Sequence, residues 1–517
     1  MNVVVAPALR HSHTVLRSLR TAIGLLLLAP LACAQQPAAP APADPAIAAA
    51  LAQVSPDRIH ATIEKLVTFN NRNTISSMET DLKPGTGINA AADWIESEFK
   101  GISAACGDCL EVRRDEFIEP PQTGPASRIL KPTKLTNVYA ILRGADPAQA
   151  KRMVLVTGHY DSRNTDTLNT HDFAPGANDD ASGVAVSIEC ARVLSKLKFP
   201  SSIVFVAVAG EEQGLNGSHH LAQLAKQQGW QLEAVLNNDI VGGDTTPGET
   251  LQDKTAVRVF SEGIPSSATP EQSRALINLG AENDSPSREL ARAVTDVSST
   301  YFTPQIHRAA QGAQPGRAHS NLVQTTPAFH PVLIFRRDRY LRGGDHTSFN
   351  AEGFTAVRIT EWRENFDHQH QNVRVENGKQ YGDLIQYVDM NYVANVARLN
   401  AATLGTLASA PGAPQNVHVA TNALDNNTEL TWEAPAGAPA GTNYEIVWRP
   451  TDQANWTMSQ GAGTATTIKL SISKDNVIFA VRSVDAAGHR SYAVMPTPTR
   501  PIRNFVQPAT PPTPPRP

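Results

Sequence analysis

The chain has 517 residues, more than one hydrophobic core usually organises, so we expect two or more domains. Its 45 basic and 49 acidic residues are interspersed and give a formal net charge of −4, while 41% of the residues are hydrophobic. This composition is ordinary for a globular protein and argues against a polycationic surface. We therefore expect neither nucleic acid nor anionic lipid as a partner.

Residues 1–34 have the pattern of an export signal. Basic residues precede the apolar run TAIGLLLLAPLACA, and Ala32-Cys33-Ala34 supplies small residues where a signal peptidase cuts. The run is too short to cross about 30 Å of hydrocarbon and no comparable run follows, which disfavours a membrane span. A lipoprotein attached through Cys33 is the weaker alternative. We expect a cleaved signal and a periplasmic or extracellular protein.

Residues 35–54 are rich in Pro and Ala and predict a linker without chemistry of its own. Export makes disulfides permissible, and three cysteines follow the signal. Cys106 and Cys109, in the segment CGDC, lie between a predicted helix and a predicted strand. This setting favours a structural disulfide over a redox-active pair. Cys190 falls inside a predicted helix, where it is expected to be a buried, small apolar residue.

The pattern of residues 55–407 predicts an α/β domain. Helical periodicity in GINAAADWIESEFKGI and SGVAVSIECARVLSKL alternates with apolar, β-branched runs such as RMVLVTG and SSIVFVAVA. Further strands are expected at KLTNVYAIL, LEAVLNNDI and GFTAVRIT, and a further helix around SHHLAQLAKQQ. Strands that are apolar throughout, placed between amphipathic helices, indicate a mostly parallel central sheet with helices on both faces.

Residues 410–503 predict a small all-β sandwich, because short alternating strands such as ELTWEAP and NYEIVWRP are separated by turn residues. The segment resembles a fibronectin type III domain: Trp432 falls where that family has an early core tryptophan, and FAVRSVDAAGHRS matches the end of its penultimate strand. The resemblance implies an accessory module, with a simple spacer as the alternative. The Pro-rich residues 504–517 are expected to be disordered.

Polar residues cluster around the ends of the predicted strands. Ligands of open α/β sheets bind beyond the carboxyl ends of the strands, so these residues are candidates for one site. The candidates are His159 and Asp161 after RMVLVTG, Glu211 and Glu212 after SSIVFVAVAG, Asp239 at the end of AVLNND, His346 in the loop before GFTAVRIT, and Asp179 at the entry to a helix.

Imidazoles and carboxylates in this combination are the donors that divalent zinc selects. Carboxylates crowded together without counter-charge would repel and resist ionisation, and a cation is the simplest way to keep them all deprotonated. Two neighbouring ions would need a carboxylate between them to offset their mutual repulsion. Asp179 is the candidate for that position.

The segments GHYDS, APGANDDASG, AGEEQGLNGS, NND and GGDHTSF, in this order, closely resemble the secreted di-zinc aminopeptidase family, which includes aminopeptidase Y and glutamate carboxypeptidase-like enzymes. The resemblance covers residues 55–407 and implies two Zn²⁺ per chain. It implies the following roles: His159 and Asp239 bind one ion, Glu212 and His346 bind the other, Asp179 bridges them, Glu211 is the general base, and Asp161 orients the imidazole of His159.

Other polar residues in these segments are assigned differently. Asp180 is expected to be a helix-entry residue, and His219 and His220 are expected on the surface of a helix. His368 and His370 lie in a stretch that resembles a family segment near the site, but they do not match its ligand positions.

The resemblance implies an exported aminopeptidase. A hydroxide held between two zinc ions would attack the peptide carbonyl, Glu211 would carry the proton to the leaving amine, and the substrate would need a free N-terminus. A carboxypeptidase or dipeptidase on the same metal site is the main alternative. The intact ligand set disfavours an inactive binding protein, and the pair His159 and Asp179 disfavours a one-zinc glutaminyl cyclase. The side-chain preference and the oligomeric state do not follow from the sequence.

Overall fold

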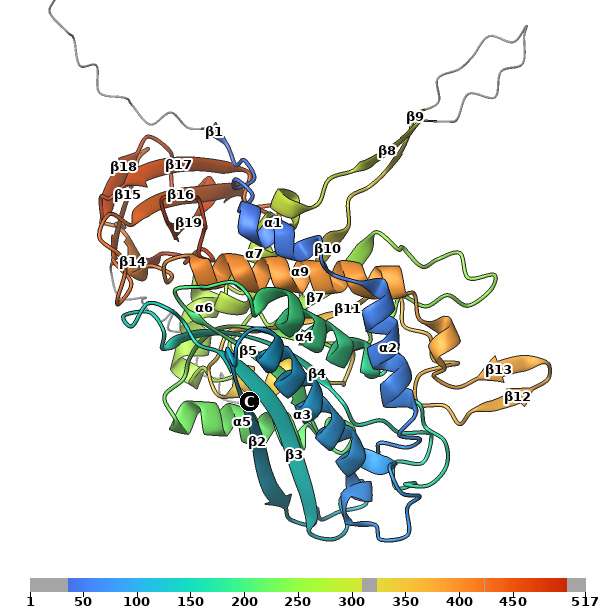
Figure 1. The fold of residues 1–517 in the computed structure, drawn as a ribbon. Coiled ribbons are helices and arrows are strands. Elements are labelled where there is room, and N and C mark those ends of the chain that lie inside the picture. Colours follow the sequence, from blue (N-terminus) through green and yellow to red (C-terminus); the bar gives the residue numbers. More distant parts are fainter. Residues whose placement is uncertain (1–35, 309–322, 423, 500–517) are drawn as a thin grey trace, which may run out of the picture. The chain divides into compact units, whose positions relative to one another are not determined.

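The computed structural model describes residues 36–308, 323–422 and 424–499 (Figure 1). Its centre is a mixed, mostly parallel sheet of eight strands, which confirms the predicted fold class. β11, β6, β4 and β5 run parallel as neighbours, and antiparallel β3 and β2 extend one edge. In order across the sheet the strands are β10 (His330–Ile334), β7 (Ala256–Ser261), β11 (Ala356–Glu361), β6 (Gln231–Asn238), β4 (Arg152–His159), β5 (Ser202–Val208), β3 (Thr133–Leu142) and β2 (Leu110–Glu119).

Helices cover both faces of this sheet because its central strands are apolar on both sides. In β4, Val154 and Val156 belong to a core shared with α4 and α9, whereas Met153 and Leu155 face a second core shared with α5 and α8. The helices are α2 (Pro56–Val67), α3 (Gly87–Ala105), α4 (Ala181–Leu194), α5 (Asn216–Gln227), α6 (Pro270–Leu279), α7 (Pro286–Tyr301), α8 (His346–Ala351) and α9 (Met390–Ser409). Short elements complete this region: η1 (Thr74–Met78), η2 (Ile385–Tyr387), β8 (Gln305–Arg308), β9 (Val323–Thr326), β12 (Arg374–Glu376) and β13 (Lys379–Tyr381).

The segment predicted as a linker is structured from residue 36 onward. β1 (Gln36–Pro37) pairs with β17, and α1 (Pro45–Leu51) follows. Asp44 caps α1 by accepting bonds from the backbone of the first turn, and Ile47 and Leu51 are buried in the core that includes α9. The composition suggested a tether, but the spacing of these two apolar residues gives one turn of helix an apolar face. The predicted signal and the Pro-rich tail lie outside the described residues.

The C-terminal region consists of two four-stranded sheets around one apolar core. One sheet has the order β1-β17-β16-β19 and the other β18-β15-β14-β20. The core contains Trp432, whose ring meets that of Tyr444 edge-on at 5.5 Å between centroids. This is the layered arrangement expected of a small sandwich. Its strands are β14 (Gln415–Val419), β15 (Thr428–Glu433), β16 (Asn443–Pro450), β17 (Met458–Gly463), β18 (Thr467–Leu470), β19 (Val477–Val484) and β20 (Thr497–Pro498).

Buried ion pairs join this sandwich to α7. Arg292, in α7, contacts Glu289 at 2.5 Å and Asp284 at 3.4 Å, and Arg449 of β16 also contacts Asp284. The indole nitrogen of Trp456 donates to Glu289 at 3.2 Å. We call Asp284, Glu289, Arg292, Arg449 and Trp456 the interface cluster. Two carboxylates face two guanidinium groups in it, so its charges balance.

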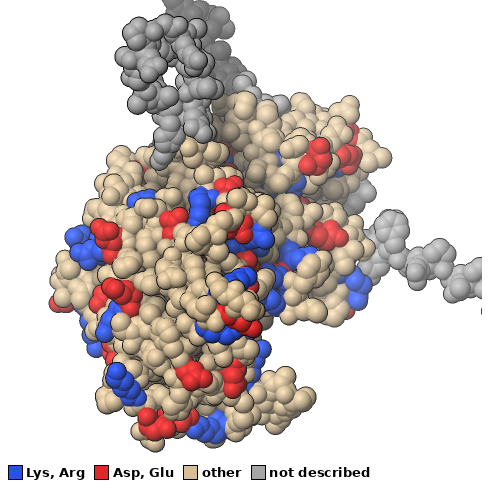
Figure 2. Space-filling view, turned by 90° about the vertical axis from the view of Figure 1, so that its right-hand side faces the viewer, with Lys and Arg blue, Asp and Glu red and all other residues tan. Residues whose placement is uncertain are grey.

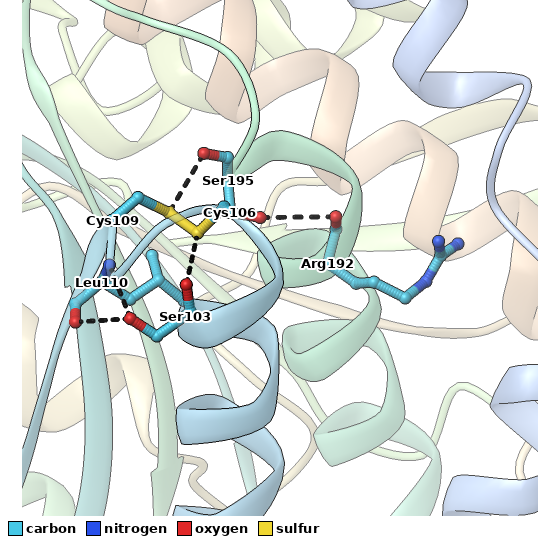
Figure 3. Close-up of a disulfide and its surroundings, with 6 residues drawn as sticks. All are labelled: Ser103, Cys106, Cys109, Leu110, Arg192 and Ser195. Carbon is cyan, nitrogen blue, oxygen red and sulfur yellow. Dashed lines mark hydrogen bonds between the residues drawn. A yellow bond between two sulfur atoms is a disulfide. The ribbon is translucent and has the colours of Figure 1, made fainter.

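The predicted disulfide between Cys106 and Cys109 is present (Figure 3). Cys106 follows the last turn of α3 and Cys109 precedes β2, so the bridge closes the tight turn between helix and strand. The sulfur of Cys109 lies 3.2 Å from the carbonyl oxygen of Ser195, just after α4. Cys190 is unpaired and buried, as predicted.

Basic and acidic side chains are interspersed over the face shown in Figure 2. Within the described residues, the helices are all too short or too polar to traverse a lipid bilayer.

Candidate metal centre

The site forms at the carboxyl ends of β4, β5 and β6. His159 is the last residue of β4, Glu211 and Glu212 follow β5, and Asp239 follows β6. These strands are parallel neighbours, so their carboxyl ends lie at one edge of the sheet. Asp179 reaches the same edge from the start of α4. Gly158 and Gly183 permit this approach, since a Cβ on Gly158 would come within 2.4 Å of the Gly183 backbone.

Three of the predicted ligands form one group. Nε2 of His159 lies 3.1 Å from Oδ1 of Asp179 and 3.9 Å from Oδ1 of Asp239. All three residues are buried, with exposed fractions of 5% or less. The donor atoms are close enough to surround one cation.

A second group shares Asp179. Nε2 of His370 lies 2.8 Å from Oδ2 of Asp179 and 3.0 Å from Oε1 of Glu212. These three atoms could also hold one cation. The two oxygens of Asp179 therefore face different histidines, as a carboxylate between two metal ions would.

The structure does not bring His346 into either group. It is the first residue of α8, and its Nε2 lies 2.8 Å from the carbonyl oxygen of Arg337. His370, rather than the predicted ligand His346, lies beside Asp179 and Glu212. His370 could have been identified from the rule that ligands bind beyond the carboxyl ends of parallel strands. β11 runs parallel to β6, and His370 follows the carboxyl end of β11, whereas His346 precedes the amino end of β11.

Asp161 fixes two parts of the site at once. Its Oδ1 lies 3.4 Å from Nδ1 of His159. Its carboxylate also accepts hydrogen bonds from the backbone nitrogens of Glu211 and Glu212, at 3.3 and 3.0 Å, and from the hydroxyl of Thr74 at 3.0 Å. The side chain therefore couples the orientation of the histidine to that of the two glutamates.

Asp180 caps α4, which confirms the prediction of a helix-entry residue. It accepts a bond from the backbone nitrogen of Gly183 at 2.9 Å. It does more than was predicted, because it also accepts bonds from the backbone of His159 at 3.0 Å and of Ile240 at 3.2 Å. Asp180 thus ties the ends of β4 and β6 to the start of α4.

Two residues that were not predicted from the sequence hold Asp179 in place. Asp383 accepts a hydrogen bond from the backbone nitrogen of Asp179 at 2.7 Å. Nε2 of Gln369 donates a hydrogen bond to Oδ2 of Asp179 at 3.1 Å. Both lie in the segment between β11 and η2, which carries His370 as well. This segment therefore completes the site that the central strands begin.

The charges of the site call for a cation. Burial, together with the nearby carboxylates of Asp239 and Glu212, raises the pKa of Glu211 well above its usual range. Burial also raises the pKa of Asp239 to about 7. Burial alone would lower the pKa of His370, but the carboxylates of Glu212 and Asp179 raise it to about 10. The site attracts positive charge, and metal binding is expected to release protons.

The donor set fits zinc. Nε2 of His159 and Oε1 of Glu212 are buried without a hydrogen-bond partner among the described residues, although each lies beside another candidate ligand. Imidazole nitrogen and carboxylate oxygen are both zinc ligands. Buried polar atoms are normally hydrogen-bonded, so these two atoms are best explained by a ligand such as a metal ion. A cluster of this kind at the carboxyl edge of an α/β sheet is typical of metal-dependent enzymes.

Comparison with known proteins identifies the family. The model of peptidase family M28 matches residues 137–310. A probable zinc metalloprotease of Pyricularia oryzae is 44% identical over 462 residues, covering 88% of this chain and 85% of the relative. One from Pyrenophora teres f. teres is 42% identical and covers 89% and 88%. The crystal structure of the LapA aminopeptidase of Legionella pneumophila covers 70% of this chain and 74% of its own, with 20% identity and a TM-score of 0.44.

The chain belongs to peptidase family M28. It is therefore a zinc metallopeptidase, and peptides are its substrates.

Proposed function

We propose that this peptidase is an exported aminopeptidase that holds two zinc ions. The observation that carries the two-ion proposal is the position of Asp179, whose two oxygens face His159 and His370 at 3.1 and 2.8 Å. In this arrangement His159 and Asp239 would hold one ion, Glu212 and His370 would hold the other, and Asp179 would serve both. The ions, when bound, supply Lewis-acid polarisation of the scissile carbonyl and lower the pKa of the attacking water.

The protein's own contribution to the reaction is proton transfer and positioning. Glu211 lines the cavity above the ligands but belongs to neither ligand group. Its carboxylate can accept the proton of the attacking water and return it to the nitrogen of the leaving amine.

The metal proposal is tested by counting zinc in the purified protein and then removing it. We expect two ions per chain, loss of activity with a chelator, and recovery with added zinc. One ion per chain in fully active protein would contradict the bridging role of Asp179. Glu212→Gln should lower the count by removing a ligand from the ion at His370, whereas His346→Ala should leave the count at two.

The aminopeptidase proposal is tested with peptides that have free and acetylated N-termini. We expect cleavage of the free peptides alone, one residue at a time from the N-terminus. Cleavage from the other end would support the alternative, a carboxypeptidase or dipeptidase. One observation favours that alternative: arginines line the cavity over the site, and a guanidinium group binds a carboxylate rather than an ammonium group.

Export is proposed from the pattern of residues 1–34 alone. Sequencing the N-terminus of the mature protein from its native host would test it. We expect the mature chain to start close to Gln35. Recovery of an intact N-terminus from the cytoplasm would contradict export.

A further inference from the structure

We propose that the cavity over the metal centre binds a carboxylate group of the substrate through Arg128 and Arg342. This inference rests on the proposed function of the site, because it concerns the peptide cleaved there. It goes further by assigning a substrate class, peptides that present a carboxylate near the scissile bond, and the two residues that select it.

The cavity has a volume of about 270 Å³ and reaches the metal-ligand candidates Asp179, Glu212, Asp239 and His370. Its wall carries four arginines, Arg128, Arg163, Arg339 and Arg342. They come from three separate loops: between β2 and β3, after β4, and between β10 and α8. Three loops converge to place positive charge around one opening.

Two of these arginines are engaged in holding the protein together. Arg163 donates to Oε2 of Glu212 at 2.7 Å, and its Nη2 lies 2.6 Å from Nδ1 of His370. Arg339 contacts Asp338 at 2.9 Å and Glu364 at 2.8 Å and donates to the carbonyl oxygen of Gly343 at 3.1 Å. Their donors are largely used, so we assign them no role in binding.

Arg128 has spare donors. Its Nη1 donates to the backbone oxygen of Glu212 at 2.6 Å, which places the guanidinium beside a metal-ligand candidate. Within the described part of the chain it forms no ion pair with a carboxylate. The backbone contact fixes its position and leaves its charge without compensation.

Arg342 has a carboxylate partner that is already shared. Its Nη1 lies 3.3 Å from Oε2 of Glu364, an oxygen that Arg339 contacts at 2.8 Å. The other oxygen of Glu364 contacts Arg258 at 3.0 Å. One carboxylate thus faces three guanidinium groups, and the side chain of Arg342 remains 31% exposed. Arg342 is available to a second anion.

With zinc bound, the positive charges of Arg128 and Arg342 would be available to a substrate. Two divalent ions, when bound, would offset the carboxylates on the cavity floor, Asp179, Glu211, Glu212 and Asp239, which would then not need the arginines as counter-charges. A guanidinium group presents paired donors that match a carboxylate, and such bonds are among the strongest in proteins. In a peptide the matching groups are the side chains of Asp and Glu and the C-terminal carboxylate.

Four peptides with one common scissile bond separate these two sources. They carry Glu or Gln beside that bond, each with a free or an amidated C-terminus. We expect the wild-type enzyme to lose about tenfold or more in kcat/KM when the relevant carboxylate is replaced by an amide. Loss on Glu-to-Gln exchange identifies the side chain, and loss on amidation identifies the C-terminus. Equal kcat/KM for all four peptides would overturn the proposal and leave the peptidase activity established.

Variants assign the effect to the two arginines. Arg128→Gln and Arg342→Gln should each reduce the preference for the carboxylate severalfold, mainly through KM, while Arg342→Lys should retain part of it. Arg274→Gln is the control, because Arg274 lies on the exposed surface of α6 and pairs with Glu271 there. An unchanged preference in both cavity variants would overturn the assignment.

Binding separates this proposal from the proposed function. Zinc-loaded Glu211→Gln protein is titrated with the same four peptides in a calorimeter, and tighter binding of the carboxylate forms is expected. Equal affinity would reject the carboxylate site whether or not the enzyme turns over. Absence of cleavage by the zinc-loaded wild type would instead reject the proposed function.

Discussion

Two buried clusters of charged residues differ in how their charges are balanced. In the interface cluster, Asp284 and Glu289 face Arg292 and Arg449, so positive and negative charges match. In the metal centre, Asp179, Asp239, Glu211 and Glu212 are accompanied by two arginines, Arg163 and Arg358, at 2.7 and 3.0 Å. The first cluster is complete within the protein, whereas the second leaves Nε2 of His159 and Oε1 of Glu212 buried without a hydrogen-bond partner among the described residues.

Buried charged residues that form a functional site can therefore be distinguished from those that form a structural cluster. Burying a charge is costly unless it is paired, so a structural cluster contains its own counter-ions. A surplus of buried carboxylates, with an unpartnered imidazole nitrogen among them, points to a ligand from outside the chain. The predictions that follow test whether the clusters behave in these different ways.

The largest effect is expected from Glu211→Gln. Removing the proton acceptor should lower kcat by roughly 10²- to 10⁴-fold. Zinc content and thermal stability should stay near those of the wild type, because Glu211 belongs to neither ligand group. The measurement is steady-state kinetics alongside metal analysis of the same sample. Activity near the wild-type value would mean that another group moves the proton.

The interface cluster should respond in stability rather than in activity. Arg449→Met leaves Asp284 and Glu289 buried with one guanidinium group, which is expected to cost about 3–5 kcal/mol. Denaturant unfolding measures this loss, and zinc content should not change. The matched control is Arg274→Met, which removes an exposed pair worth about 0–1 kcal/mol. Equal losses in the two variants would show that the interface cluster contributes no more than a surface pair.

A smaller effect is expected from Asp161→Asn. The amide group cannot accept all the bonds that reach this carboxylate from Thr74, Glu211 and Glu212. Zinc affinity or activity should fall by about 10- to 100-fold, as for other residues that orient a metal ligand. Thr74→Val removes one of these bonds and should have a weaker effect. If Thr74→Val were as damaging as Asp161→Asn, the hydroxyl rather than the contact to His159 would be the main determinant.

The smallest effect concerns pH and the contact between the N-terminal segment and the sandwich. Nδ1 of His489 lies 2.6 Å from Asp485, and its Nε2 lies 3.0 Å from Asp44. Burial alone would lower the pKa of His489, but these two carboxylates raise it. A raised pKa in the folded state means that the protonated form stabilises the fold. This contribution is complete below the usual pKa of about 6.5 and is lost as the pH rises through the folded-state value.

His489→Gln should therefore be less stable than the wild type in mildly acidic solution, with the difference shrinking in alkaline solution. Unfolding midpoints measured across this pH range provide the check. A difference that grew with pH would contradict the assigned protonation.

Most of the sheet could be predicted because its strands are locally distinct. RMVLVTG and SSIVFVAVA are continuously apolar, and they form β4 and β5 as expected. His159, Glu212 and Asp239 lie at or just beyond the carboxyl ends of β4, β5 and β6, and Asp179 reaches the same edge just before α4. His370 could not be placed in the same way, since it lies nine residues beyond β11 in a loop ordered by tertiary contacts such as that of Asp383 with the start of α4.

The N-terminal segment is harder to read because its composition hides its packing. Prolines and alanines suggested a tether, but Ile47 is 1% exposed. Burial of a few apolar side chains against an existing helix stabilises such a segment, and composition averages do not detect it.

The position of β1 and α1 has a practical consequence. Gln36 and Pro37 add a strand to the sandwich, while Ile47 packs into the core beneath the central sheet, so the twelve residues from Gln36 to Ile47 fasten the two regions together. A protein trimmed at residue 55 to discard an apparent tether would lose both attachments. An affinity tag on protein produced without residues 1–34 should precede Gln35, and proteolysis near Asp44 should loosen the sandwich before it disturbs catalysis.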